Sequence, residues 1–137
     1  MAGRQAEVQA PSGLTAAAIE RRLPVWCALS DLFLDNELQP FELDWIARQL
    51  VESGFSTGEL RRILIDEVAP AFAPNLMGVA GEWAGWGPDD VREIVLRSMR
   101  CRRDPFRWFA KKTGYRMVAS VWSDIERRIE AAAGTPA

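Results

Sequence analysis

Three acidic residues are the side chains of this sequence whose type and spacing could support chemistry. Asp31 and Asp35 are four positions apart, which places them one turn apart on a helix. Such a pair could hold a hard cation or act as a general acid and base. Glu82 lies between Gly81 and Trp83, where an apolar pocket would raise the pKa of its carboxyl. We favour structural roles for all three, as partners of backbone groups or arginines, because buried acids are usually paired.

The rest of the composition excludes most catalytic machinery. The 137 residues include no histidine and only two cysteines, Cys27 and Cys101. Without imidazole there is no Ser-His-Asp or Cys-His system, and two thiols alone cannot complete a tetrahedral zinc site. The stretch 85–90 lacks the third glycine of a dinucleotide fingerprint and carries acids where a phosphate would lie. We therefore expect no catalytic residues, no bound metal and no cofactor.

Helices must position these side chains, because apolar residues recur at helical spacing and no useful alternating strand pattern is present. We expect an all-α fold, a compact irregular bundle of five to six helices. Residues 14–133 form a single domain between a disordered N-terminal tail, 1–13, and a frayed C-terminus, 134–137. No apolar run has the length of a signal peptide or a membrane span. The sequence therefore predicts a cytoplasmic protein that does not contact a membrane.

The central element is a buried helix that ends near Asp35. Apolar side chains surround it on most sides: Val25, Trp26, Leu29, Leu32, Phe33 and Leu34. A helix over 41–53 follows, with an inward stripe of Leu43, Ile46, Ala47 and Leu50. A third helix begins with a capping box formed by Ser56 and Glu59, and we expect Pro70 to end it.

The C-terminal half predicts four more helical segments. A short helix covers about 74–83, and a long helix follows Pro88. Asp104 and Pro105 open another short helix, which Gly114 closes as a C-terminal glycine. The last helix runs over about 115–132, with Trp122 on its inner face.

One tryptophan is expected on the surface. Trp45 projects away from the apolar stripe of its helix, among charged neighbours, whereas we expect most of the six tryptophans in the core. Tryptophan and arginine are enriched among residues that dominate protein interfaces. The expected interface consists of Trp45, Glu42, Asp44, Arg48 and Glu52. Coverage of Trp45 by the tail or by another helix is an equally good interpretation.

The charges are divided between two regions of opposite sign. Residues 30–67 hold nine acids against three arginines, a net charge of −6, and residues 91–116 hold nine bases against two acids, a net charge of +7. The candidate basic patch comprises Arg97, Arg100, Arg103, Arg107, Lys111 and Lys112. With Phe106, Trp108, Phe109 and Tyr115 interleaved, it could bind phosphates and stack on bases. We disfavour nucleic acid, because the aromatic residues fall at core spacing and the pI of 5.2 opposes polyanion binding.

Two sequence blocks resemble an uncharacterised family of small bacterial helical proteins. The first is Trp26-Cys27-Ala28-Leu29-Ser30-Asp31-Leu32-Phe33-Leu34-Asp35. The second contains Val68-Ala69-Pro70, Pro74-Asn75-Leu76 and Val79-Ala80-Gly81-Glu82-Trp83-Ala84-Gly85. The blocks cover about a third of the chain, and the family is a domain of unknown function. The resemblance implies no activity, cofactor or site residue.

Three functions remain open at this stage. The first is a non-enzymatic protein-protein interaction module, such as a bacterial immunity protein that neutralises a toxin, with a protein partner of unknown identity. The second is a carboxylate-based enzyme or ligand-binding domain in which Asp31, Asp35 and Glu82 line one pocket. The third is a nucleic-acid-binding regulator that uses residues 91–116. We favour the first, because the acidic surface around Trp45 would steer a basic partner.

Overall fold

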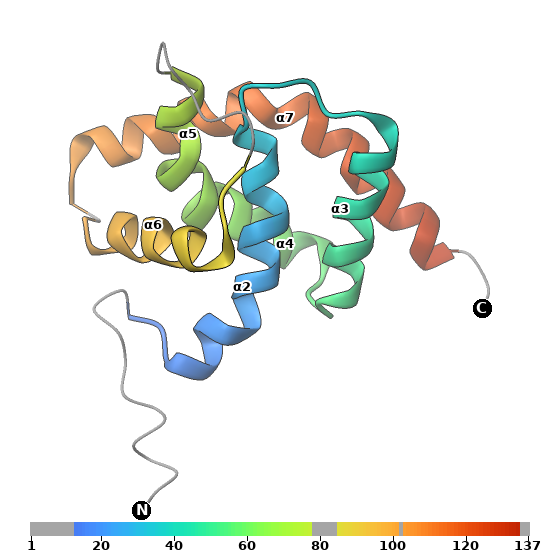
Figure 1. Cartoon of the computed structure of the whole chain (residues 1–137), viewed down its shortest axis with the longest axis horizontal. Coiled ribbons are helices and arrows are strands. Elements are labelled where there is room, and N and C mark those ends of the chain that lie inside the picture. The colour runs from blue at the N-terminus through green and yellow to red at the C-terminus, as the bar shows by residue number, and fades with distance from the viewer. Residues whose placement is uncertain (1–12, 78–84, 102, 135–137) are drawn as a thin grey trace, which may run out of the picture.

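The chain folds into an irregular bundle of helices. The structure is a computed structural model, and it describes residues 13–77, 85–101 and 103–134. Its helices are α2 (Ala16–Ser30), α3 (Pro40–Glu52), α4 (Thr57–Ile63), α5 (Ala69–Met77), α6 (Pro88–Arg100) and α7 (Pro105–Gly134), with a 3₁₀ turn η1 (Asp31–Phe33) and a π-helix η2 (Leu64–Val68). The described residues contain no β-strand, so the all-α prediction is confirmed. Figure 1 shows α7 crossing the molecule from the α5 side to the α3 side.

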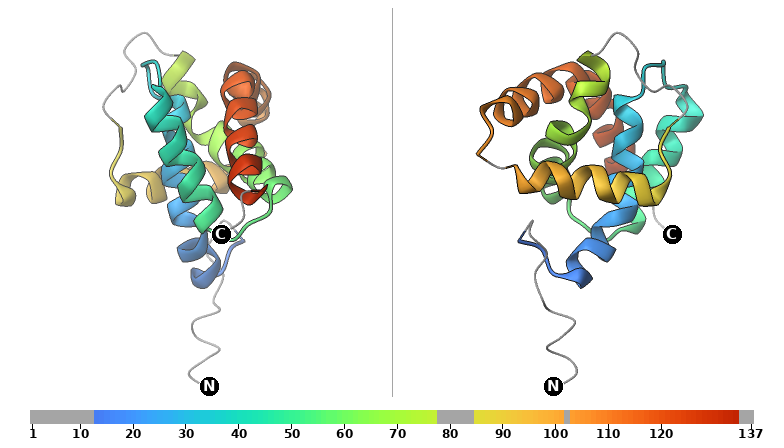
Figure 2. Two further views of the ribbon diagram at one scale, coloured as in Figure 1. Left: turned by 90° about the vertical axis from the view of Figure 1, so that its right-hand side faces the viewer. Right: turned by 60° about the vertical axis from the view of Figure 1, so that its left-hand side comes forward.

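Helix α2 is the central element. The Thr15 hydroxyl caps it by accepting a hydrogen bond from the Ala18 N–H at 3.1 Å, and it packs against α3, α6 and η2. All six apolar side chains predicted for this segment are buried. The two further views in Figure 2 show α2 alongside α3 and crossed by α6. The helix ends earlier than expected, at Ser30, and Leu34 is already extended.

Pro70 does not end a helix, contrary to the sequence prediction. Helix α4 continues through η2 into α5, and Pro70 is buried inside this rod. In a regular helix the Asp66 carbonyl would accept a hydrogen bond from residue 70, and proline has no N–H to give. The Arg107 guanidinium donates to the Asp66 carbonyl instead, at 2.8 Å. A distant arginine thereby binds a backbone carbonyl in the turn that precedes the proline.

Gly114 lies inside α7 rather than at the end of a short helix, so the two predicted helices are one. A Cβ atom at Gly114 would lie 2.6 Å from the Cβ of Ala73 and 3.2 Å from the carbonyl oxygen of Ala69. Glycine is therefore required for the close approach of α5 and α7. Further along α7, Trp122 is fully buried, and its indole N–H has no hydrogen-bond partner among the described residues.

Candidate functional site

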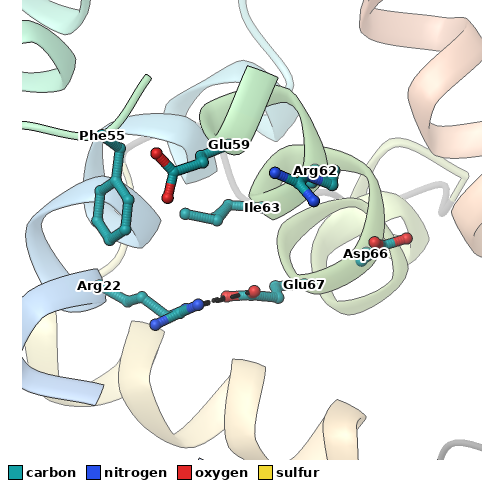
Figure 3. A pocket seen from close by; sticks show the side chains of 7 residues that line it. All are labelled: Arg22, Phe55, Glu59, Arg62, Ile63, Asp66 and Glu67. Carbon is teal, nitrogen blue, oxygen red and sulfur yellow. Dashed lines mark hydrogen bonds and ion pairs between the residues drawn. The ribbon is translucent and has the colours of Figure 1, made fainter. Parts of the chain in front are cut away.

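A polar cleft opens beside α4, where α2 and η2 approach one another. It has a volume of about 320 Å³ and is lined by Arg22, Phe55, Glu59, Arg62, Ile63, Asp66 and Glu67. Figure 3 shows Arg22 and Glu67 pointing toward one another, with the Asp66 carboxylate turned away from that pair. Charged side chains from distant parts of the sequence meet here, as they also do where Arg61 pairs with Glu126 at 2.7 Å and where Arg128 pairs with Asp44.

Glu67 is the centre of the polar cluster. Its carboxylate accepts a hydrogen bond from the Trp26 indole N–H at 2.8 Å and forms an ion pair with Arg22 at 3.3 Å. Burial raises the pKa of the Glu67 carboxyl, and the bonds from Trp26 and Arg22 act in the opposite direction. The carboxylate thus ties α2 to η2, and the sequence analysis did not identify it. A glutamate directly before a buried valine in a helix gives no local signal of a partner 41 residues away.

The π-helix sets the directions of Asp66 and Glu67. Asp66 forms an ion pair with Lys111 at 2.6 Å, and its backbone carbonyl accepts the hydrogen bond from Arg107. Asp66, Glu67, Arg107 and Lys111 also line a second opening, together with Leu14 and Met99. Two residues of the predicted basic patch, Arg107 and Lys111, therefore bind groups of the same chain.

The other side chains that line the cleft also contact groups of the protein, and Arg62 is the exception. Glu59 accepts the hydrogen bond of the capping box from the Ser56 N–H at 3.1 Å, as predicted. The guanidinium groups of Arg21 and Arg22 lie 4.1 and 5.7 Å from the centre of the Phe55 ring. Arg62 is exposed and has no ion pair with a described residue. The carboxylates are thus held as structural partners, which does not favour a role in proton transfer.

Asp31 and Asp35 do not line this cleft. Asp31 lies half-buried in η1, and burial, reinforced by the nearby Glu42 carboxylate, raises its pKa from 3.8 to about 6. Asp35 is exposed beyond the end of the helix. No cation of the described residues lies within ion-pair distance of either acid. Glu82 lies outside the described residues.

The two family-like sequence blocks meet in space. The Asn75 side-chain amide donates to the Phe33 carbonyl at 2.8 Å, where the backbone of η1 ends. Phe72 is buried beside them, and its ring lies 4.7 Å from that of Trp86. The described parts of both blocks therefore join η1 to α5, which is a role in architecture.

The outer face of α3 exposes large apolar side chains. Trp45 is 47% exposed, Phe41 is 72% exposed and Val51 is 41% exposed. Phe41 and Trp45 are one turn apart, a spacing that the sequence already contained and that we did not use. Trp45 is therefore exposed in the structure and Phe41 shares its face, whereas Val51 is turned about 120° from Trp45 and lines the adjacent groove.

The charged residues predicted around Trp45 divide into engaged and available groups. Asp44 forms an ion pair with Arg128 of α7, and Glu42 accepts a hydrogen bond from the Gln39 N–H at 3.1 Å to cap its own helix. Arg48 and Glu52 are exposed and line a groove between α3 and α7 of about 400 Å³, together with Asp44, Ala47, Val51, Arg128 and Ala132.

Three of the four aromatic residues of the basic segment are exposed, so the prediction that they belong to the core is wrong for them, whereas Tyr115 is half-buried and packs against the core. Phe106 is 53%, Trp108 61% and Phe109 52% exposed. At this end of α7 the inner face is formed instead by small side chains, Ala110 and Gly114, which lie where α7 approaches α5 closely. The surface therefore combines aromatic rings with the bases that follow them.

The six candidate basic residues lie in different settings. Arg97 pairs with Glu93 at 2.5 Å, and Arg107 and Lys111 contact Asp66 as described. Lys112 lies over the Trp108 ring, with its ammonium 4.6 Å from the ring centre. Arg100 and Arg103 are exposed near the turn between α6 and α7. Fewer of these six bases are thus available to a partner than the composition suggests.

The described residues form no group of three or more acidic or cysteine side chains placed to bind a metal ion. Within the same residues, no helix combines the length and apolar character needed to cross a membrane.

These features define an all-α helical domain whose polar contacts mainly join its helices. Comparison with known families identifies the domain further. A family model matches residues 20–128, and the chain belongs to that family, the domain of unknown function DUF7079. No curated protein and no solved structure matches the chain.

Proposed function

We propose that the domain is a non-enzymatic protein-interaction module that binds a basic protein partner through the outer face of α3. The observation that carries this proposal is the exposure of Phe41, Trp45 and Val51 on one helix beside a groove. Large apolar side chains that are exposed together mark binding surfaces, and tryptophan is the residue most enriched among interface hot spots.

The charge around this face favours one class of partner. Asp35, Glu37 and Glu52 are exposed on or just before α3, and none has an ion pair with a described residue. Arg48 is the single base within the face, and Arg128 at its edge is already paired with Asp44. Unpaired acids around an apolar centre favour a basic partner, because opposite charge accelerates encounter and rejects acidic proteins. A toxin with a basic surface is the partner class to examine first, in agreement with the immunity-protein hypothesis.

The test replaces Trp45 with a photoreactive phenylalanine analogue in cells of the native host. We expect a discrete cross-linked protein from position 45 and none from the same analogue at Glu130, an exposed control site on α7. The purified partner should then bind the wild-type chain, with an affinity that falls at least tenfold, about 1.4 kcal/mol, in Trp45→Ala. Trp108→Ala is the matched control, because it removes an exposed tryptophan from another surface. Equal cross-linking from both positions, or equal affinity of Trp45→Ala and wild type, would refute the proposal.

A further inference from the structure

A second groove runs along α7, away from the α3 face. It has a volume of about 490 Å³ and lies between η2 and the middle of α7; its lining comprises Ile65, Lys111, Lys112, Tyr115, Arg116 and Ala119. Its walls are mostly apolar, and we name it the α7 groove. An apolar groove of this kind can accept apolar side chains from a partner. In this protein, cationic side chains also line the groove.

Two of the cations that line the α7 groove are available to a partner. Lys112 and Arg116 are exposed, and neither has an ion pair with a described residue. Lys111 is different, because its ammonium is already paired with Asp66. An occupant that supplies carboxylates beside apolar groups would therefore pair two charges that the chain itself leaves unpaired.

Exposed aromatic rings extend this surface toward the start of α7. Trp108 precedes Lys112 by four residues, so the two side chains share one face of the helix, with the ammonium resting on the ring. Phe109 is also exposed, one residue further along. Rings that stay on the surface beside an apolar groove supply the large contact area on which peptide recognition depends.

We propose that the α7 groove binds an acidic amphipathic helix of a partner protein. The apolar stripe of such a helix would enter the groove, and its acidic residues would pair with Lys112 and Arg116. Single-stranded nucleic acid fits less well, because two free cations neutralise few phosphates and the whole chain carries a net charge of −2. The lysine over Trp108 also competes with a base for one face of that ring.

The proposal is tested with the whole chain and a synthetic peptide of about 18 residues, long enough to form a helix. The peptide carries leucine at every third or fourth position, four glutamates beside that stripe and alanine or glutamine elsewhere, and a scrambled peptide of the same composition is the control. We expect titration calorimetry to show binding of the patterned peptide and at least tenfold weaker binding of the scrambled one. Amide NMR shifts should fall on α7 and η2.

Variants separate this surface from the α3 face. Lys112→Glu combined with Arg116→Glu should weaken peptide binding at least tenfold, and Trp108→Ala should weaken it as well, whereas Trp45→Ala should leave it unchanged. Circular dichroism melting checks that each variant is folded. Equal binding of both peptides, full binding by the double variant, or tighter binding of oligothymidine than of the peptide would each overturn the proposal. Because Trp45→Ala and Trp108→Ala affect different surfaces, failure here would leave the α3 proposal standing.

Discussion

Replacement of Asp31 by asparagine should stabilise the protein at neutral pH. Asp31 is half-buried, and burial together with the nearby Glu42 raises its pKa to about 6. At pH 7.5 the native protein must therefore keep a carboxylate in a poorly solvated place. Asparagine has nearly the same shape and no charge, so it removes this cost.

The direction of the pH effect follows from proton binding. Between pH 3.8 and about 6 the native state holds the Asp31 proton more tightly than the unfolded chain does, so the free energy of unfolding falls as pH rises through this window. Above about pH 6 this contribution is constant. The increase in pKa corresponds to about 3 kcal/mol at 1.36 kcal/mol per pKa unit, and solvent screening of a half-buried group reduces it to about 1 to 2 kcal/mol.

Urea denaturation at pH 4.5 and pH 7.5 measures this effect. We expect Asp31→Asn to gain about 1 to 2 kcal/mol over wild type at pH 7.5 and much less at pH 4.5. The matched control is Asp35→Asn, which changes an exposed acid of the same sequence block and should alter stability little at either pH. An Asp31 pKa of 4 or below by carbon NMR titration, or equal effects of the two variants, would refute the reasoning.

Three further changes test the packing, the polar cluster and the thiols. Gly114→Ala should cost about 1 to 3 kcal/mol in urea denaturation, because the new methyl group would overlap α5, whereas Gly58→Ala, with open space around it, should not destabilise. Glu67→Ala should cost about 1 to 3 kcal/mol in the same assay, because it leaves a buried indole N–H without its acceptor. A thiol reagent should label the exposed Cys101 well before Cys27, whose pKa is raised by burial and then by Asp31, and mass spectrometry would show the order. Labelling of Cys27 first would contradict that account.

The sequence predicted those parts of the fold that depend on local pattern. The buried segment around Trp26, the inward stripe of α3 and the capping box at Ser56 each follow from spacing within one helix. Pro70 could not be interpreted in this way, because Arg107, which binds a backbone carbonyl in the turn that precedes it, lies far along the chain. Local rules assign a proline to a helix end, and only the tertiary contact overrides them.

The candidate site depended even more on contacts between distant residues. Glu67 became recognisable only when the fold placed Arg22 and Trp26 beside it. The exposure of Trp108 was missed for a related reason: spacing shows which residues share a helical face, but not which face the neighbouring helix covers. In α7 the covered face is the one that contains Gly114, because this glycine contacts α5.

The length of α7 has a consequence for the two proposed binding surfaces. Both grooves are lined by this one continuous helix, with Lys112 in the α7 groove and Arg128 in the α3 groove. At 1.5 Å and 100° per residue, the sixteen positions between them correspond to about 24 Å along the helix and to a rotation of about 160°, so the two side chains leave nearly opposite sides of α7. A partner with two linked segments of suitable spacing would bind the second segment at high effective concentration after the first. The linker between the two segments would have to pass around α7, so the helix would select bivalent partners by the length of that linker.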